Sequence, residues 1–323
     1  MGKFPVWAPV CYFFTMESNN VSNLDPDRVD DLELPENYIH RELSVLGFFR
    51  RVLAMAGDTG HPLLERLRFL AICSTITDEF FEIRVSGLRH RIELGLDRVR
   101  PDGLGQVESL RQISETVLEL VTEQYRLLND SVLPALAEEG VSLIRRQDWT
   151  EEQREWVQTY FEEQVAPVLT PVGLDPAHPF PRVVNKSLNM LVALDGADAF
   201  GRQSQYAVLP VPRCLPRVIP LPREVSSTAH SFVLLSSVVH AHANQVFPGM
   251  KIEGVHQFRV TRNADLLVEE DEIDDLLDAL KGELFNRRYG DAVRLEVTSS
   301  CPEEEVKILR EQFDLDDGAV FRV

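Results

Sequence analysis

The 323-residue chain has few cysteines, and none of them lies close to another. Cys11, Cys73, Cys214 and Cys301 are all more than four residues apart. The sequence therefore lacks the short cysteine pairs of zinc ribbons and of thioredoxin-like redox proteins. We expect four reduced thiols, the usual state of cysteine in a cytoplasmic protein, and no metal site.

Positive charge is also scarce. The chain has 33 Lys and Arg against 52 Asp and Glu, which gives a formal net charge of -19. Such a chain repels polyanions at long range, so we expect no nucleic-acid partner. A local arginine pocket for phosphate is still compatible with this charge, because salt screens the distant field more than it screens a close contact.

Long apolar runs and glycine-rich phosphate loops are missing as well. No run approaches the roughly 20 apolar residues of a membrane helix, so we expect no transmembrane segment and a cytoplasmic or membrane-peripheral location. The patterns G-x-x-x-x-G-K-[ST], G-x-G-x-x-G and G-x-S-x-G do not occur. The chain is therefore not a standard P-loop protein, dinucleotide-binding protein or α/β-hydrolase.

The first 37 residues have the character of a flexible lead-in. Residues 17–35 are polar and acidic, and the short apolar stretch before them is broken by Pro5 and Pro9. That stretch resembles a signal peptide only weakly, because no small-residue cleavage site follows it. Met16 is an alternative initiator.

A helical pattern extends over residues 38–140. Apolar side chains recur with a 3.6-residue period over 41–56, and a second helix is expected from Pro62. A long amphipathic helix follows the loop 100–106 and ends at Gly140. These segments predict an N-terminal helical bundle domain. The expected buried stripe of the long helix comprises Val107, Leu110, Ser114, Val117, Val121, Leu128, Val132 and Leu136.

The stretch 74–88, "STITDEFFEIRVSGL", combines acidic and aromatic residues. Thr75 or Thr77 is expected to cap a third helix, with Asp78 and Glu79 in its first turn, where the helix dipole favours acids. An acid–base pair is the alternative interpretation of the two carboxylates. Adjacent residues point apart on a helix, which favours the helix start.

The pattern changes at residue 141, and residues 141–323 predict an α+β domain with a mixed or antiparallel sheet. Helices are expected over 150–166 and 269–288 and from Pro302. The last strand stops without a polar tail, which suggests that the chain was cut from something longer. The expected strands are 141–144, 188–194, 205–212, 231–239, 256–268 with a turn at its end, 292–298 and 319–323.

Two groups of residues are candidate ligand sites. Arg84 and Arg91 lie seven positions apart on one helix face, where they predict a phosphate contact; the alternative is a solvated basic face. His240 and His242 invite a metal interpretation. Their surroundings are helical, and residues two apart on a helix point about 200° apart, which argues against a shared ion.

Several long blocks together resemble the polyphosphate kinase family of the type 1, histidine-phosphorylated kind. Their order and spacing also match, over about residue 38 to the end. The most specific blocks are "RELSVLGFFRRVL", "DEFFEIRVSGLRHRI", "LTPVGLDPAHPFP", "FRVTRNADL" and "VRLEVTSSCPEEEVKILREQF".

The resemblance implies a helical N-terminal domain over 38–140 and a head domain over 141–323, with two C-terminal catalytic domains absent from this chain. It implies reversible transfer of the ATP γ-phosphate to polyphosphate through a phosphohistidine, with ATP or ADP as substrate and Mg²⁺ as cofactor. It places the phosphohistidine and the magnesium site in the absent domains, so no catalytic residue and no metal ligand is expected here. The present domains are expected to help bind nucleotide and to form a homodimer or a higher homo-oligomer.

Three positions depart from the family pattern. Ile76 stands where the family has an asparagine that contacts ATP, and Val45 and Phe49 replace a tryptophan and an asparagine. Isoleucine can neither donate to nor accept from a base edge. These departures leave open an alternative, a stand-alone non-catalytic paralogue that acts as a binding or dimerisation module.

Overall fold

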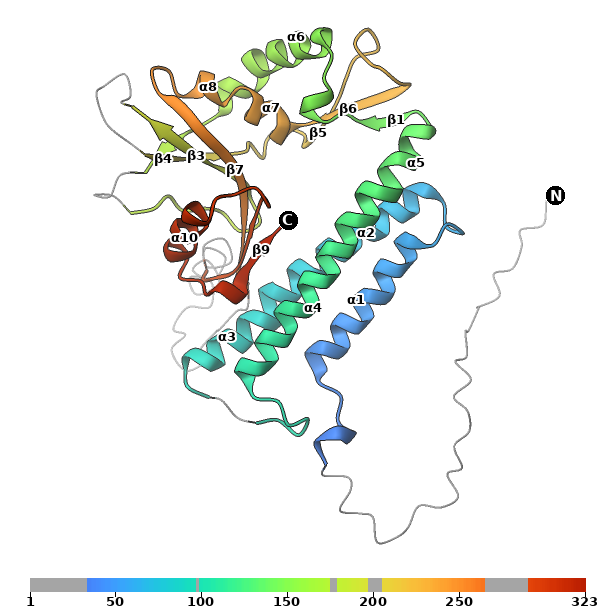
Figure 1. The fold of residues 1–323 in the computed structure, drawn as a ribbon, viewed down its shortest axis with the longest axis vertical. Coiled ribbons are helices and arrows are strands. Elements are labelled where there is room, and N and C mark those ends of the chain that lie inside the picture. The colour runs from blue at the N-terminus through green and yellow to red at the C-terminus, as the bar shows by residue number, and fades with distance from the viewer. Residues whose placement is uncertain (1–33, 97–98, 175–178, 197–204, 265–289) are drawn as a thin grey trace, which may run out of the picture.

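A bundle of long helices precedes an α+β region with a mixed sheet, which confirms the fold class predicted from the sequence (Figure 1). The expected lead-in falls almost entirely, and the expected helix 269–288 wholly, outside the described residues. The computed structural model describes residues 34–96, 99–174, 179–196, 205–264 and 290–323.

The helices of the first region run side by side in a layer that flanks the second region, the α+β part of the chain (Figure 1). His40 caps α1 by accepting a hydrogen bond from the backbone N–H of Leu43 at 3.3 Å. A π-helical turn, Phe80–Val85, joins α2 to α3, and a second one, Leu128–Val132, joins α4 to α5. The helices are α1 (Arg41–Gly57), α2 (Leu63–Glu79), α3 (Ser86–Glu93), α4 (Gln106–Leu127) and α5 (Leu133–Glu138).

The predicted helix start at Thr75 or Thr77 is wrong. Both residues lie inside α2, and their hydroxyls donate to the carbonyls of Ala71 and Cys73, one turn back, at 3.0 and 2.8 Å. A threonine hydroxyl can satisfy a carbonyl within a helix as well as cap a helix, so the residue type alone did not separate the two cases. Asp78 therefore needs an explanation other than the helix dipole.

The buried stripe of the long helix was predicted in part. Val117, Val121, Val132 and Leu136 are buried as expected, whereas Val107 is 58% exposed. The miss lies at the start of the helix, where the buried positions are the polar residues Gln106 and Ser109, which bond to Arg91 and His40 through tertiary contacts that hydrophobic periodicity does not anticipate. The buried positions of α4 are Gln106, Ser109, Ile113, Val117, Leu120, Val121 and Leu127.

The described strands of the second region form a six-stranded sheet in the order β2-β4-β3-β7-β8-β9 and a three-stranded sheet in the order β1-β6-β5. The pairs β8–β9 and β1–β6 are parallel, and the other pairs are antiparallel. The strands are β1 (Val141–Leu143), β2 (Val172–Gly173), β3 (Leu188–Asp195), β4 (Tyr206–Pro210), β5 (Val218–Pro220), β6 (His230–Leu234), β7 (Lys251–Arg262), β8 (Ala292–Val297) and β9 (Val320–Arg322).

Helices cover both faces of the six-stranded sheet. On β3, Met190 and Val192 contribute to the apolar core shared with α6 and α7, while Leu191 faces the core beneath α10. A strand buried on both faces has the continuous apolar run seen at 188–194. The expected strand 231–239 ends at Leu234, because α7 begins at the next residue. The helices are α6 (Glu151–Tyr160), α7 (Leu235–Ala241), α8 (Ala243–Val246) and α10 (Glu303–Gln312).

Among the described helices, none has both the length and the apolar character needed to cross a membrane.

Candidate functional site

One side of the continuous α2–α3 helix lies against the second region. Phe81 meets Phe321 of β9 edge to face, with ring centroids 5.6 Å apart. Glu82 accepts hydrogen bonds from Asn185 at 2.7 Å and from the ammonium of Lys186 at 3.0 Å. Phe81 and Glu82 of the stretch 74–88 thus form part of the seam between the two regions.

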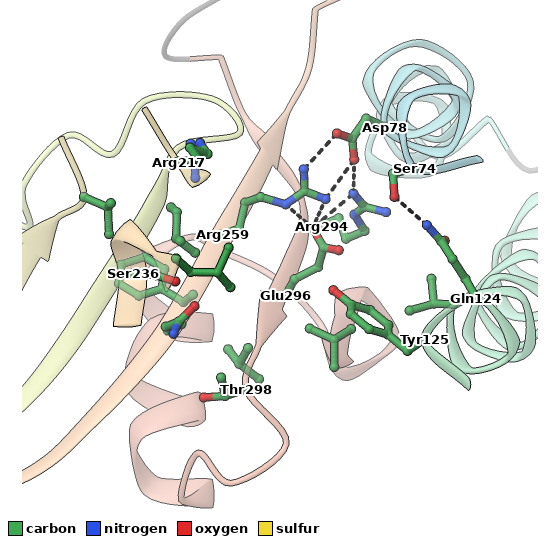
Figure 2. Close-up of a pocket in the computed structure, with 18 of the residues that line it drawn as sticks. Ser74, Asp78, Gln124, Tyr125, Arg217, Ser236, Arg259, Arg294, Glu296 and Thr298 are labelled. Atoms are coloured by element: carbon green, nitrogen blue, oxygen red, sulfur yellow. Dashed lines mark hydrogen bonds and ion pairs between the residues drawn. The ribbon is translucent and has the colours of Figure 1, made fainter. Parts of the chain in front are cut away.

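Asp78 is the centre of this seam (Figure 2). It receives a two-pronged contact from Arg259 of β7, with Nη1–Oδ2 at 2.8 Å and Nη2–Oδ1 at 2.9 Å. Arg294 of β8 donates to the same carboxylate. Glu296 of β8 accepts from Nε of Arg259 at 2.6 Å and lies 3.1 Å from Nη2 of Arg294.

Burial makes the charge balance of this cluster important. The side chain of Arg294 is 2% exposed and its guanidinium lies 4.6 Å from the centroid of the Phe81 ring. Two guanidinium groups face two carboxylates, so the cluster is neutral. Burial raises the pKa of Asp78, but the charges of Arg294 and Arg259 outweigh it, and the pKa is lowered overall. Burial likewise lowers the pKa of Arg259, and the two carboxylates more than reverse that effect.

A cavity of about 550 Å³ opens beside the cluster, between α2 and α4 on one side and the sheet on the other (Figure 2). Asp78, Arg259, Arg294 and Glu296 lie on its wall, and Arg217 lines it from the segment before β5. Its volume falls within the range of 300–1,000 Å³ usual for small-molecule pockets.

Two polar groups on the cavity wall have no partner among the described residues. The Arg217 side chain makes no hydrogen bond or ion pair with any of them. The hydroxyl of Thr298 is buried, and it has no hydrogen-bond partner among them either. Burial and the nearby charges of Arg213 and Arg259 lower the pKa of Arg217. An anion bound beside Arg217 would relieve this repulsion between cations.

The opposite wall is formed by polar side chains of α4 and α2. Gln124 donates to the hydroxyl of Ser74 at 2.6 Å and to the carbonyl of Leu70 at 2.9 Å, which fixes its orientation at the cavity rim. Burial and the negative charge of Glu296 raise the pKa of Tyr125, so its phenol remains a hydrogen-bond donor at neutral pH.

The site residues predicted from the sequence lie elsewhere. Ile76 is half-buried and packs against the helical core, where the other two departing positions, Val45 and Phe49, also lie. Arg84 is exposed, and Nε of Arg91 donates to Gln106 at 3.1 Å. None of these five residues lines the cavity. Their roles in nucleotide or phosphate binding stay predictions.

The two candidate histidines have different surroundings. Nδ1 of His240 lies 2.6 Å from a guanidinium nitrogen of Arg146. Burial lowers the pKa of His240. Nδ1 of His242 lies 2.9 Å from the carbonyl of Val238, and its ring stacks on Phe161 with centroids 4.6 Å apart. Each histidine is thus accounted for by contacts that differ from those of the other.

Sequence reasoning missed Arg217, Arg259 and Arg294. Arg259 and Arg294 lie in strands and Arg217 lies in a loop, and no local motif separates these residues from a solvated cation. The alternation in β8 does place Arg294 on the same side as Ala292 and Glu296. This signal becomes informative only when the partner carboxylate is known.

Comparison with known protein families identifies the two regions. The model of the polyphosphate kinase N-terminal domain matches residues 38–144, and that of the polyphosphate kinase middle domain matches residues 152–323. The chain belongs to the polyphosphate kinase family. The family was thus correctly identified from the sequence blocks.

Individual relatives agree with this assignment. Over 295 residues the chain is 52% identical to the polyphosphate kinases of Pseudomonas aeruginosa and Pseudomonas putida, covering 91% of this chain and 42% and 40% of theirs. The crystal structure of polyphosphate kinase from Porphyromonas gingivalis superposes with a TM-score of 0.70 at 25% identity, covering 88% of this chain and 39% of that one. The chain therefore spans about two fifths of the length of these family members.

Proposed function

We propose that this chain supplies a nucleotide- and phosphate-binding part of a polyphosphate kinase, and that the cavity at the seam is where it binds phosphate groups. The reaction would be reversible transfer of the ATP γ-phosphate to polyphosphate through a phosphohistidine outside the matched two fifths of the family length. No residue of this chain is assigned a catalytic role. The observation that supports the proposal is Arg217, which lies on the wall of a ligand-sized cavity and has no hydrogen-bond or ion-pair partner among the described residues.

Electrostatics favours an anion in this cavity despite the acidic chain. Its charged side chains are Arg217, Arg259, Arg294, Asp78 and Glu296, which sum to +1. The two carboxylates are neutralised within the seam cluster, so Arg217 carries the charge available to a ligand. A guanidinium presents a planar fork of donors that matches phosphate oxygens, which makes it suited to this role.

Mg²⁺ does not fit the protein groups of this cavity. Asp78 and Glu296 are its carboxylates, and arginines already occupy both. A magnesium ion usually needs one or two available carboxylates in addition to substrate phosphates. We therefore assign it no ligand among the described residues.

Replacing Arg217 by alanine is expected to weaken the binding of ATP and of a short polyphosphate about tenfold or more, because a hydrogen bond to a charged group contributes about 1.5–3 kcal/mol. Isothermal titration calorimetry on the purified chain measures this. The matched control is Arg68→Ala, which removes an exposed arginine of α2 that does not line the cavity. Equal affinities of wild type and Arg217→Ala would contradict a phosphate site here.

Replacing Ile76 by asparagine tests the alternative of a non-catalytic paralogue. If the helical domain binds the adenine side of ATP, the restored amide is expected to increase ATP affinity several-fold and to leave polyphosphate affinity unchanged. The same titrations measure both. Affinity for neither ligand in the wild type and in Ile76→Asn would favour the paralogue, whose function would then be assembly.

Assembly is a separate part of the proposal. We propose that the head domain forms a homodimer or a higher homo-oligomer. Light scattering of the purified chain at several concentrations measures its mass, and a monomer throughout would contradict this part without affecting the phosphate site.

A further inference from the structure

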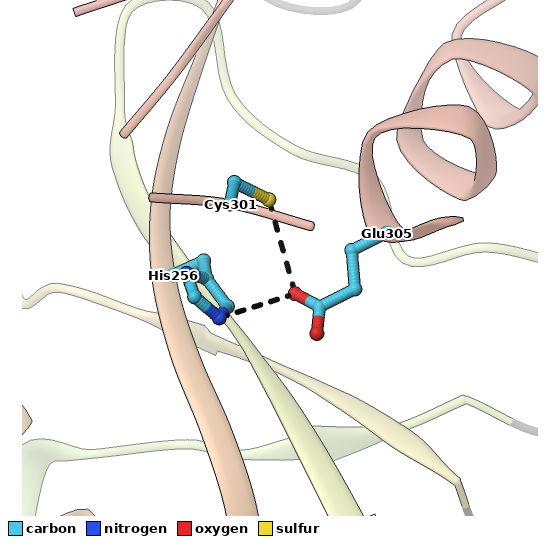
Figure 3. Close-up of side chains that lie close together, drawn as sticks. All are labelled: His256, Cys301 and Glu305. Atoms are coloured by element: carbon cyan, nitrogen blue, oxygen red, sulfur yellow. Dashed lines mark hydrogen bonds and ion pairs between the residues drawn. The ribbon is translucent and has the colours of Figure 1, made fainter. Parts of the chain in front are cut away.

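Three metal-ligating side chains meet beside α10, and none of them lines the seam cavity (Figure 3). His256 projects from β7, Cys301 lies in the turn between β8 and α10, and Glu305 lies in the first turn of α10. Their donor atoms all lie within 4.8 Å of one another. The polyphosphate kinase function proposed above uses none of the three.

Hydrogen bonding within the described chain does not account for the position of His256. Its Nδ1 atom is buried without a partner, and its Nε2 atom lies 3.7 Å from Oε2 of Glu305, beyond hydrogen-bond length. Cys301 Sγ lies 3.8 Å from the same oxygen. The partnerless Nδ1 atom carries the cost of burying a polar group, while Nε2 faces Glu305, where an ion can bind.

The donor atoms have nearly the spacing of a metal coordination sphere. In a tetrahedral zinc site with bonds of about 2.0–2.3 Å, neighbouring donors lie roughly 3.3–3.7 Å apart. The 3.7 and 3.8 Å separations lie at or just above the upper end of this range, and the three donor atoms all lie within 4.8 Å of one another. Side-chain rotations that close the remaining distances would bring the three donors onto one ion.

Gly254 keeps space open at this cluster. A Cβ atom at this position would lie 2.9 Å from His256 Nε2 and 3.6 Å from Oε1 of Glu305. Residues 254 and 256 project to the same face of β7, so any larger side chain at 254 would press on the donor atoms. The glycine thus leaves room that a metal ion, together with a water molecule, can occupy.

We propose that His256, Cys301 and Glu305 bind a divalent transition metal of the zinc class, with water or a further small ligand in the fourth position. Nitrogen and sulfur donors select such an ion over Mg²⁺, which prefers oxygen. Binding forms a metal–sulfur bond and releases the thiol proton of Cys301 to solvent. The thiolate and the carboxylate then balance the two positive charges of the ion, so the buried site is neutral.

The protonation states expected without metal agree with this stoichiometry. Burial lowers the pKa of His256, so its imidazole is neutral and able to coordinate. Burial and the charge of Glu305 raise the pKa of the Cys301 thiol to about 12. Burial also raises the pKa of Glu305.

Titration of the purified chain with Co²⁺ tests the site. Cobalt replaces zinc with little change of geometry, and a cobalt–thiolate bond gives a near-ultraviolet charge-transfer band. We expect this band at one equivalent, its displacement by Zn²⁺ and its persistence in excess Mg²⁺. Absence of the band at saturating Co²⁺ would overturn the proposal.

Variants assign the donors. Cys301→Ser is expected to abolish the band and to weaken Co²⁺ binding at least tenfold, and His256→Gln to weaken it similarly. The matched control is Cys214→Ser, which removes an exposed thiol and should change neither quantity. Gly254→Ala keeps all three donors and is expected to weaken binding by crowding them, which covers the case in which a donor variant misfolds. A band that survives in Cys301→Ser would exclude this site.

Discussion

Replacing Asp78 by asparagine is expected to lower the free energy of unfolding by about 3 kcal/mol, the lower end of the cost of breaking a buried ion pair. The substitution keeps the side-chain volume, removes the charge and replaces one accepting oxygen by an NH2 donor, which cannot accept from the arginines. Arg259 and Arg294 would then share the single carboxylate of Glu296, and Arg294 is 2% exposed, so water cannot compensate its charge. Urea unfolding followed by far-ultraviolet circular dichroism measures the loss.

The matched control is Glu119→Gln. Glu119 forms an ion pair with Arg50 across α1 and α4, so it is also a contact between segments distant in sequence, but both side chains are more than half exposed. Exposed pairs contribute little to stability, so this variant should unfold close to the wild type. Equal losses in Asp78→Asn and Glu119→Gln would show that the seam cluster does not behave as a buried network.

Acid is expected to reduce the difference in the free energy of unfolding between the wild type and Asp78→Asn. The pKa of Asp78 is lower in the folded chain than in the unfolded chain, where it is about 3.9. The stability gained from its ionisation is therefore present above that value and is lost as the pH falls through the lower, folded pKa. The difference in the free energy of unfolding between the two proteins should stay constant from pH 7 to about pH 5, and it should become smaller only below about pH 4.

Replacing Phe81 by alanine is expected to cost about 3–5 kcal/mol, the usual range for a buried phenylalanine. Its ring is 1% exposed, meets Phe80 and Phe321 edge to face, and lies beneath the guanidinium of Arg294. Truncation would leave a cavity at the point where the helices contact β9. It would also remove the aromatic face that supports the charge of Arg294.

Two probes can show whether Phe81 joins the regions or only stabilises the helices. The fluorescence of Trp149 and Trp156 reports the second region, to which both residues belong. The circular dichroism at 222 nm reports mainly the helices. We expect the two transitions to coincide in the wild type and to separate in Phe81→Ala. Phe48→Ala is the matched control, since that ring is 49% exposed. A loss in Phe81→Ala no larger than in this control would contradict the assigned role.

Local pattern was sufficient for most elements of the fold. The 3.6-residue period located α1 and α4, Pro62 marked the beginning of α2, and the continuous apolar run at 188–194 located β3, because these signals depend only on neighbouring residues. The same approach failed at Thr75 and Thr77, where one hydroxyl is compatible with both a helix start and a helix interior. It also failed at the start of α4, where the buried positions Gln106 and Ser109 are polar, since hydrophobic periodicity registers only apolar residues.

The sequence by itself determined the family and the order of the two regions, because each of these is a property of the linear order of residues. Only the tertiary structure decided the role of Asp78. Its partners Arg259 and Arg294 lie 181 and 216 positions further along the chain, and no local pattern encodes such a pairing. Folding brings these charges together in a site that water hardly reaches, and that exclusion of solvent makes their balance matter for stability.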